Sequence, residues 1–412
     1  MPFSKNRCLA LALGLFFLVL WTANSAEITV PKLEMASRGW VDDGDFVVSS
    51  HLSADLALTG GYKYAIFLGL SLEAPDLAKA FAYGNFKFGY LPTGLGVTTD
   101  EYNTLVDEIN DRLNNQAYIG FRAARATVRD IFNIPLELSY FVGSDDDFLT
   151  GDEFSVRYGL SPFGSDFRGF FYFPDGIGGV PTRRYDGIYN VRGTGFSLTL
   201  TKWNFITPSL YLYHDFASYG DYYSSGSLYS GDLRVLFYHN WLRIEAFGGV
   251  SLNKDLDTEL RGGLMAHFAG KGVEFFAQAG IPGFIWGEKF DIDNLFFLFE
   301  PRLQRGLFGM SLTFFYHPVI YNHIITPGER GKANINLKFL AGKMESGFSG
   351  GIEFGAGIKI NEINEDFDFT VSPLTSFISG SLRWDAKVRI RPLEYDNPEK
   401  IVELFFGVRT AF

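Results

Sequence analysis

The chain has a single cysteine, Cys8, among its 412 residues, and this cysteine lies within the first 26. One cysteine forms no disulfide within the chain. If the N-terminal segment is removed, no thiol nucleophile and no thiolate metal ligand remain. Backbone pairing and side-chain packing must then hold the fold together. Beyond residue 26 the sequence also lacks a run of about 18 apolar residues, the length expected of a membrane-spanning helix.

Motifs of common cofactor sites are also absent from the sequence. There is no phosphate-binding loop, no dinucleotide-binding glycine pattern and no zinc-ligand spacing. His317 and His323 lack the spacing of metal ligands on one helix face. His214 and Asp215 are the only adjacent histidine and acid, and they are the remaining candidate for catalysis. We therefore expect no enzyme activity, no cofactor and no metal site.

Basic residues are too few for a nucleic-acid-binding protein. The chain carries 36 lysine and arginine residues against 47 aspartate and glutamate residues, a formal charge of −11. Loss of residues 1–26 would remove Lys5 and Arg7, lowering the basic count from 36 to 34 and the charge to −13. A chain this acidic repels the phosphate backbone, so we expect no nucleic-acid partner.

The first 26 residues have the three-part pattern of a secretory signal peptide. A short basic start precedes an apolar run over residues 8–21, and small residues follow at positions 22–26. The apolar run is too short to span a bilayer as an anchor. We interpret residues 1–26 as a signal peptide cleaved after Ser25 or Ala26, and expect export through the Sec pathway.

What the chain does contain is aromatic residues and glycine. It has 43 phenylalanines, 21 tyrosines and 46 glycines, yet its mean hydropathy is only +0.04. Aromatic residues suit a pleated sheet, and glycine marks turns and close backbone approaches. A neutral average built from very apolar and very polar residues is expected when lipid-facing and lumen-facing positions alternate along each strand.

The order of these residues supports strands, because apolar and polar residues alternate with a period of two. In residues 382–390 Leu382, Trp384 and Ala386 alternate with Arg383 and Asp385. Residues 62–73, 335–339 and 352–360 show the same alternation. Alternating segments of about nine to eleven residues match tilted strands crossing a bilayer. A slip of one residue would move charges into lipid at about 2–4 kcal/mol each, so the register is strongly specified.

The last segment carries the alternation to the C-terminus. One of its faces is formed by Val402, Leu404, Phe406, Val408, Thr410 and Phe412. This ending resembles the C-terminal assembly signal of bacterial outer-membrane β-barrel proteins, with Phe406, Val408, Thr410 and Phe412 as its residues. The resemblance implies a barrel in the outer membrane of a diderm bacterium, with outer-membrane lipid and the barrel assembly machinery as partners.

We therefore expect an all-β fold, a single antiparallel transmembrane β-barrel with an even strand number near 18, within a range of 16–20. Short connections such as residues 239–240 and 343–346 largely alternate with longer polar ones such as residues 174–192 and 319–332. Residues 162–164 are interpreted as another short turn. Residues 27–45 are interpreted as a short N-terminal lead-in and residues 46–412 as the barrel, with no second domain.

One segment departs from the strand period. Between residues 99 and 116, Leu105, Ile109 and Leu113 are four apart, which predicts a short amphipathic helix inside a long loop. Its polar face carries Asp107, Glu108 and Asp111, the candidates for a constriction if this loop folds into the pore. The alternative is a solvated cap or a periplasmic element.

Charged residues within the alternating segments are the candidates for the pore lining. They are Arg122, Arg125, Arg234, Arg243, Glu245, Glu259, Arg261, Glu274, Lys338, Glu353, Arg383, Asp385, Lys387 and Arg389. Opposed basic and acidic walls select solutes by charge and size, as in general diffusion porins; the alternative is that paired charges only fill a wet interior. The interpretation as a porin implies passive diffusion of small hydrophilic solutes, with a homotrimer as a possible oligomeric state.

Other interpretations remain open at the level of sequence. The acidic stretch Asp145, Asp146, Asp147, Asp152 and Glu153 is expected to be a solvated loop, with Ca²⁺ binding as the alternative. The tyrosine-rich residues 219–229 would suit an adhesin or structural barrel. A transporter of hydrophobic compounds is a further alternative, but such barrels carry an N-terminal hatch, for which residues 27–45 are short.

Overall fold

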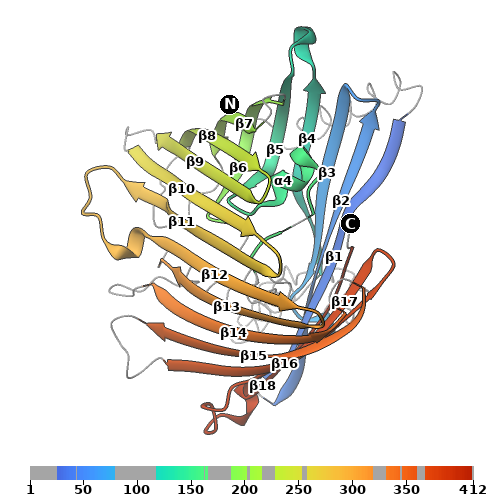
Figure 1. Cartoon of the computed structure of the whole chain (residues 1–412), viewed down its shortest axis with the longest axis vertical. Helices are drawn as coiled ribbons and strands as arrows, with labels where there is room; N and C mark the ends of the chain where they lie inside the picture. The colour runs from blue at the N-terminus through green and yellow to red at the C-terminus, as the bar shows by residue number, and fades with distance from the viewer. Residues whose placement is uncertain are drawn as a thin grey trace, which may run out of the picture.

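Eighteen antiparallel strands close into a β-barrel (Figure 1). The computed structural model describes residues 26–42, 44–78, 117–161, 163–165, 187–201, 205–215, 228–252, 258–318, 331–343, 346–359 and 367–410. Each strand pairs with the next along the chain, and the last pairs with the first, so no strand edge runs the length of the sheet. The expectation of an all-β barrel with an even strand number near 18 is confirmed.

The strands are β1 (Ala26–Asp42), β2 (Asp45–Gly60), β3 (Tyr64–Ala74), β4 (Tyr118–Arg129), β5 (Leu136–Phe148), β6 (Tyr189–Leu200), β7 (Ile206–Asp215), β8 (Leu228–His239), β9 (Leu242–Leu252), β10 (Thr258–Ala269), β11 (Val273–Ile285), β12 (Phe296–Arg305), β13 (Phe308–His317), β14 (Lys332–Gly342), β15 (Gly347–Lys359), β16 (Phe367–Ser379), β17 (Leu382–Ile390) and β18 (Val402–Thr410). The described helices are α4 (Asp152–Tyr158) and the single 3-10 turns η1 (Ile131–Asn133), η5 (Ile292–Asn294) and η7 (Pro398–Lys400).

The two faces of the barrel wall differ because successive side chains of a strand point to opposite sides. In β18, Leu404 and Phe406 are each 44% exposed, whereas Glu403 and Phe405 are 4% and 3% exposed. In β17, Trp384 is exposed and Lys387 is buried. Apolar side chains thus cover the outer face, and charged side chains lie on the inner face.

The connections differ between the two ends of the barrel. Every link from an even-numbered strand to the next odd-numbered strand is short, down to residues 306–307 and 380–381. Gly380, with φ of 61°, supplies the left-handed backbone of one such turn. Both chain ends of the barrel lie at this short-turn end, since Ala26 pairs with Gly60 and the Leu33 N–H donates to the Thr410 hydroxyl at 3.1 Å.

The interpretation of residues 27–45 as a lead-in is wrong, because residues 26–42 form β1. This strand pairs with β2 along its whole length and with β18 from Glu34 to Gly39, so it closes the barrel. A bulge between Thr29 and Lys32 interrupts its register where Pro31 lacks a backbone N–H. The bulge breaks the period of two that identifies the other strands.

Several sequence expectations fall outside the described residues. They are residues 1–25 of the signal peptide expected over residues 1–26, the helix over residues 99–116 with Asp107, Glu108 and Asp111, and the terminal Phe412. The other residues of the proposed assembly signal, Phe406, Val408 and Thr410, lie in β18, the closing strand.

Candidate functional site

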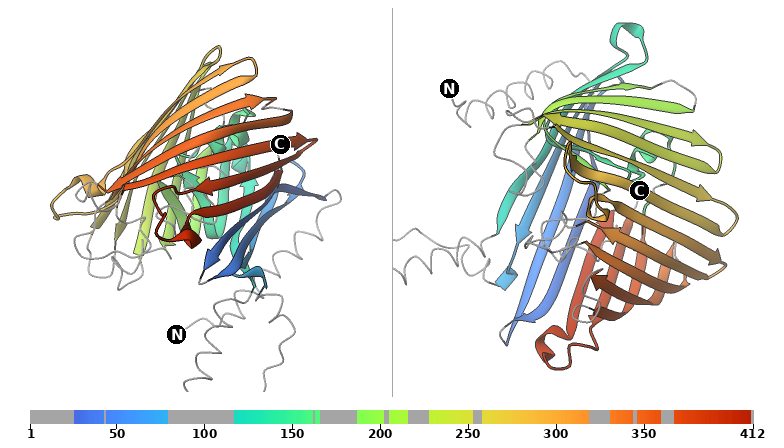
Figure 2. Two further views of the ribbon diagram at one scale, coloured as in Figure 1. Left: turned by 90° about the horizontal axis from the view of Figure 1, so that it is seen from below. Right: turned by 90° about the vertical axis from the view of Figure 1, so that its left-hand side faces the viewer.

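A segment of the chain leaves the wall after β5 and folds into the barrel, where α4 contacts the inner side of β5 and β8 and lies among the strands in the views of Figure 1 and Figure 2. We call the described residues 149–161 and 163–165 the lumen segment. Gly151, with φ of 89°, turns the chain into α4, and a Cβ at this position would lie 2.7 Å from the Phe163 ring. Residues 162–164 are therefore not a turn between strands, and that interpretation is wrong.

Aromatic packing holds the lumen segment against the inner wall. Phe148, Leu149 and Phe154 have no exposed surface. The Phe148 ring lies 5.2 Å from Tyr211 of β7 and 5.0 Å from Phe247 of β9. These side chains belong to one buried cluster on the inner side of β5 to β13, formed with Met265, Phe276, Phe296, Leu298 and Phe315 among others.

The far end of the lumen segment is tied to β10–β12. The Phe163 ring stacks on His267 of β10 with a centroid distance of 4.3 Å and an interplanar angle of 11°. The Ser165 hydroxyl donates to Glu300 of β12 at 2.8 Å, and Arg302 donates to the Gly164 carbonyl. The segment therefore crosses the interior from β5 to β12.

Hydrogen bonds fix its near end as well. The Leu149 N–H donates to the Glu245 carboxylate of β9 at 2.8 Å, and Gln278 of β11 donates to the Leu149 carbonyl. Strands distant in sequence thus satisfy polar backbone groups that would otherwise be buried without partners. The position of the lumen segment is set by the wall.

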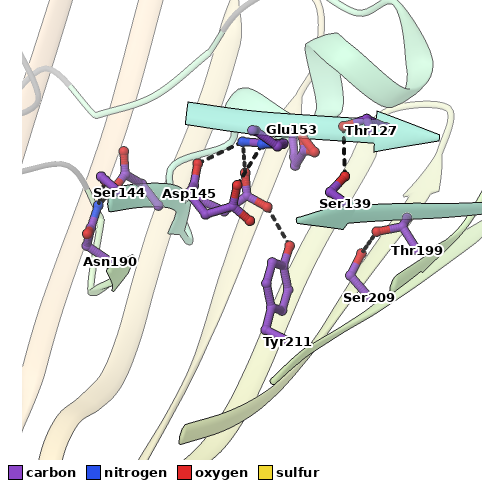
Figure 3. A network of polar contacts seen from close by, with 12 residues as sticks. Thr127, Ser139, Ser144, Asp145, Glu153, Asn190, Thr199, Ser209 and Tyr211 are labelled. Carbon is purple, nitrogen blue, oxygen red and sulfur yellow. Dashed lines mark hydrogen bonds and ion pairs between the residues drawn. The ribbon is translucent and has the colours of Figure 1, made fainter. Parts of the chain in front are cut away.

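Charged groups meet where the lumen segment begins (Figure 3). Arg125 of β4 lies 2.6 Å from the Asp145 carboxylate and 3.2 Å from that of Asp146. Tyr211 donates its hydroxyl to Asp146 at 2.5 Å. Arg234 of β8, almost fully buried, lies 3.5 Å from Asp146 and also pairs with the carboxylate of Glu245.

The acidic stretch is therefore not a solvated loop. Asp145 and Asp146 lie in β5, and the Asp145 side chain has no exposed surface. Asp152 and Glu153 form the first turn of α4, with Glu153 buried and paired with Arg157 at 3.2 Å. Arg125 and Arg234 lie beside Asp145 and Asp146, and Arg157 lies beside Glu153, so arginines neutralise these carboxylates. Among the described residues no group of three or more acidic, histidine or cysteine side chains is arranged to hold a metal ion.

Arg157 connects α4 to the wall. Its guanidinium lies 3.0 Å from the Glu137 carboxylate of β5 and 3.2 Å from that of Glu153. Burial lowers the pKa of Arg157, but the two carboxylates raise it by more, so the net shift is upward and the guanidinium stays charged. The pairing holds α4 close to β5.

A second buried group lies on β6–β10. Arg261 forms two hydrogen bonds to the Asp232 carboxylate, at 2.6 and 2.9 Å, in the fork geometry of a strong pair. Tyr213 donates to Asp232 at 2.8 Å, and Tyr189 donates to Asp215 at 3.0 Å. The Arg261 guanidinium also lies 4.2 Å from the centroid of the Tyr189 ring.

A third group lies across the barrel closure, and it carries more cations than carboxylates. Arg38 of β1, Arg389 of β17 and Arg391 all pair with Glu403 of β18, at 2.5, 3.0 and 3.0 Å. Nearby, Arg383 and Arg409 lie 3.0 and 3.6 Å from Asp385, and Lys387 lies 2.5 Å from Glu353. The side chains of Arg383 and Arg409 are each about one-third exposed.

The structure places the sequence-predicted pore-lining residues on the inner face. The remaining members are placed as follows: Arg122 pairs with Asp55; Arg243 donates to His267 at 2.8 Å; Glu274 lies 3.7 Å from His267; Glu259 is opposite buried Ser251; and Lys338 is opposite Glu353. Sequence reasoning missed partners such as Asp55, Asp232, Glu300 and Glu403. The signal for Asp232 was its position two residues before Arg234, on the same side of β8.

His214 and Asp215 do not form a catalytic pair. They are adjacent in β7, so their side chains point to opposite faces of the wall. Asp215 is buried on the inner face, where it accepts a hydrogen bond from Tyr189, whereas the His214 ring lies 5.4 Å from that of Tyr229.

No family model matches this chain, and no curated protein matches it. Solved structures with a related fold include a mutant of the porin of Rhodopseudomonas blastica, with 10% identity, a TM-score of 0.43 and coverage of 94% of this chain and 100% of the porin. Acinetobacter baumannii OccAB4 has 11% identity and a TM-score of 0.47, and Pseudomonas aeruginosa OpdK, solved with vanillate, has 9% and 0.46. Each of the two alignments covers 94% of this chain and 98% of the other. At these values the likeness tells nothing about a solute or partner of this chain.

In the described part of the chain, no helix has both the length and the apolar character needed to cross a membrane.

Proposed function

We propose that this protein is an outer-membrane channel through which small hydrophilic solutes diffuse passively, with the lumen segment narrowing the path. The observation that carries the proposal is the division of the wall into an apolar outer face and a charged inner face around a closed barrel. A closed barrel leaves no unpaired strand edge in lipid, so it is one of the two architectures that span a bilayer. Charged side chains on the inner wall are unfavourable in contact with lipid but are well solvated by water and can bind polar solutes.

The orientation follows from the two ends of the barrel. Bacterial barrels have short turns on the periplasmic side and longer loops outside. The short-turn end, which also carries both ends of the strand array, is therefore the periplasmic end in this proposal. The proposed assembly signal in β18 is then presented to the barrel assembly machinery beside β1, its closing partner.

The inner charges would act on solutes through a transverse field. Arg38, Arg383, Lys387, Arg389 and Arg409 outnumber the carboxylates at the barrel closure, whereas arginines balance Glu137, Asp145, Asp146 and Glu153 of β5 and the lumen segment. β17 and β18 are about half the circumference away from β8 and β9, so the basic region lies across the lumen from the wall that anchors the lumen segment. An excess of cations on one side of the lumen orients polar solutes and sorts them by charge and size.

Planar-bilayer recording of the refolded protein tests the proposal. Folding is first shown by heat-modifiable gel mobility, and ohmic single-channel openings are then expected. Folded protein that stays electrically silent contradicts the channel and favours an adhesin or structural barrel, whereas lipid release from micelles would identify an enzyme. A homotrimer remains a prediction for cross-linking in membranes.

A transporter of hydrophobic compounds is less well supported by the geometry. Residues 26–42 belong to the barrel wall as β1, so they do not form a hatch inside it. The inner wall of the described strands is rich in ion pairs, which offer little to an apolar solute.

A further inference from the structure

The outer face of β12–β15 has a hollow close to the short-turn end, in an otherwise bulky apolar surface. Its volume is about 360 Å³, at the lower end of the roughly 300–1,000 Å³ typical of small-molecule pockets. The strands that form it lie side by side in Figure 1. The lining is almost entirely apolar, and its side chains include Phe308, Met310 and Phe339.

The hollow exists because two small residues face each other across β14 and β15. Ala341 of β14 is directly opposite Gly350 of β15. The next outward-facing pair of the same two strands is bulky, Phe339 with Ile352. On its other side, Ala341 is opposite Phe308 of β13. The Phe308 side chain, which is 71% exposed, stands at one side of the gap. A Cβ at Gly350 would lie 3.6 Å from the Leu374 carbonyl oxygen and 4.0 Å from the Phe348 ring, so the backbone there does not require glycine.

One cation lies at the rim of this apolar hollow. Arg305, the last residue of β12, lines the hollow and is exposed, and it forms no ion pair within the described residues. It precedes the turn at residues 306–307, and exposed Lys343 follows β14 in the neighbouring turn at the same end of the barrel. An arginine beside the turns at the end of the barrel is suited to binding a phosphate group, because its guanidinium donates two parallel hydrogen bonds to phosphate oxygens.

We propose that the hollow binds one phospholipid of the bilayer leaflet at the short-turn end, with an acyl chain between Phe308 and Phe339 and the phosphate on Arg305. The inference rests on the proposed position of the barrel in a membrane, but not on its conducting solutes. An apolar cavity that ends at an unpaired arginine at the level of the turns matches the two halves of a phospholipid. A second copy of the chain would have to bring both an apolar projection and an anion to the same place.

Native mass spectrometry of the folded full-length barrel in detergent, titrated with phosphatidylglycerol, tests the proposal. Wild type is expected to retain one lipid. Gly350→Leu fills the hollow and Arg305→Gln removes the phosphate ligand, and each is expected to weaken retention of the lipid by about tenfold or more. Ala341→Leu fills the hollow from the opposite strand and replaces Gly350→Leu if that variant does not fold.

Matched controls separate the hollow from general effects of the surface. Ala356→Leu makes the same substitution as Ala341→Leu on the outer face of β15 outside the hollow, and Lys271→Gln removes an exposed cation from another turn at the short-turn end. Both controls are expected to bind the lipid as wild type does. Equal retention by wild type, Gly350→Leu and Arg305→Gln would overturn the proposal, as would an oligomer whose subunits cross-link through Gly350→Cys.

Conductance recorded on the same variants keeps the two proposals distinguishable. Loss of the lipid with unchanged openings supports the lipid site and leaves the channel intact. A wild-type protein that binds the lipid but never conducts supports the site and contradicts only the channel.

Discussion

Phe154 is the residue whose removal most directly tests whether the lumen segment restricts the pore. It is fully buried, and its ring lies 5.8 Å from Tyr158 and 5.6 Å from Phe163, the aromatic residues that dock α4 and the end of the segment. Tyr158 in turn shares a hydrogen bond of 2.9 Å with Thr207 of β7. Phe154→Ala therefore removes the centre of the aromatic packing while leaving every strand ladder in place.

The magnitude follows from the buried ring. Truncating a buried phenylalanine to alanine costs about 3–5 kcal/mol. Because the strands do not depend on this ring, most of the loss is expected to appear as local detachment of the segment. At about 1.4 kcal/mol for each factor of ten, the ratio of detached to docked segment should rise by about 10²- to 10³-fold.

Single-channel recording is the assay, and Phe154→Ala is expected to show a larger mean conductance and more current noise than wild type. Val156→Ala is the matched control, because Val156 lies in the same helix with its side chain 73% exposed. This control should conduct as wild type does. If folded Phe154→Ala and wild type have the same conductance and noise, the lumen segment does not narrow the path.

Three further predictions concern charge, stability and assembly. Arg409→Gln, which removes a partly exposed cation from the barrel closure, should shift the reversal potential in a salt gradient toward cation preference, whereas Lys271→Gln in a turn at the short-turn end should not; equal shifts would argue against a field from the inner wall. Asp232→Asn leaves the buried Arg261 guanidinium without its carboxylate and should lower the free energy of unfolding by about 3–5 kcal/mol. This free energy is measured by urea titration, with the heat-modifiable gel shift as the signal for folded protein, and Glu288→Gln in an exposed loop should leave it unchanged. Replacing Phe412 with Asp should reduce the amount of assembled barrel in membranes more than it changes the conductance of the barrels that form; normal assembly would contradict its role in the signal.

The fold class was predictable because a period of two requires no knowledge of distant contacts. In residues 382–390 the alternation alone assigns Arg383, Asp385 and Lys387 to one face, and the cost of a charge in lipid selects that face as the inner one. The strand β1 was missed for a local reason: Pro31 and the bulge beside it shift the register in mid-strand, so the pattern is not continuous.

The sequence by itself therefore determined the barrel, its strand number within two, and the charged character of its inner face, because each depends on the residue and its immediate neighbours. Only the tertiary structure decided that the lumen segment, residues 149–161 and 163–165, enters the barrel. Their partners, Glu245, His267, Gln278 and Glu300, are supplied by strands about a hundred residues later in the chain. From sequence alone, an acidic stretch is predicted to be a solvated loop, because the arginines that neutralise it are distant in the chain. These arginines come to lie beside the carboxylates only when the barrel closes.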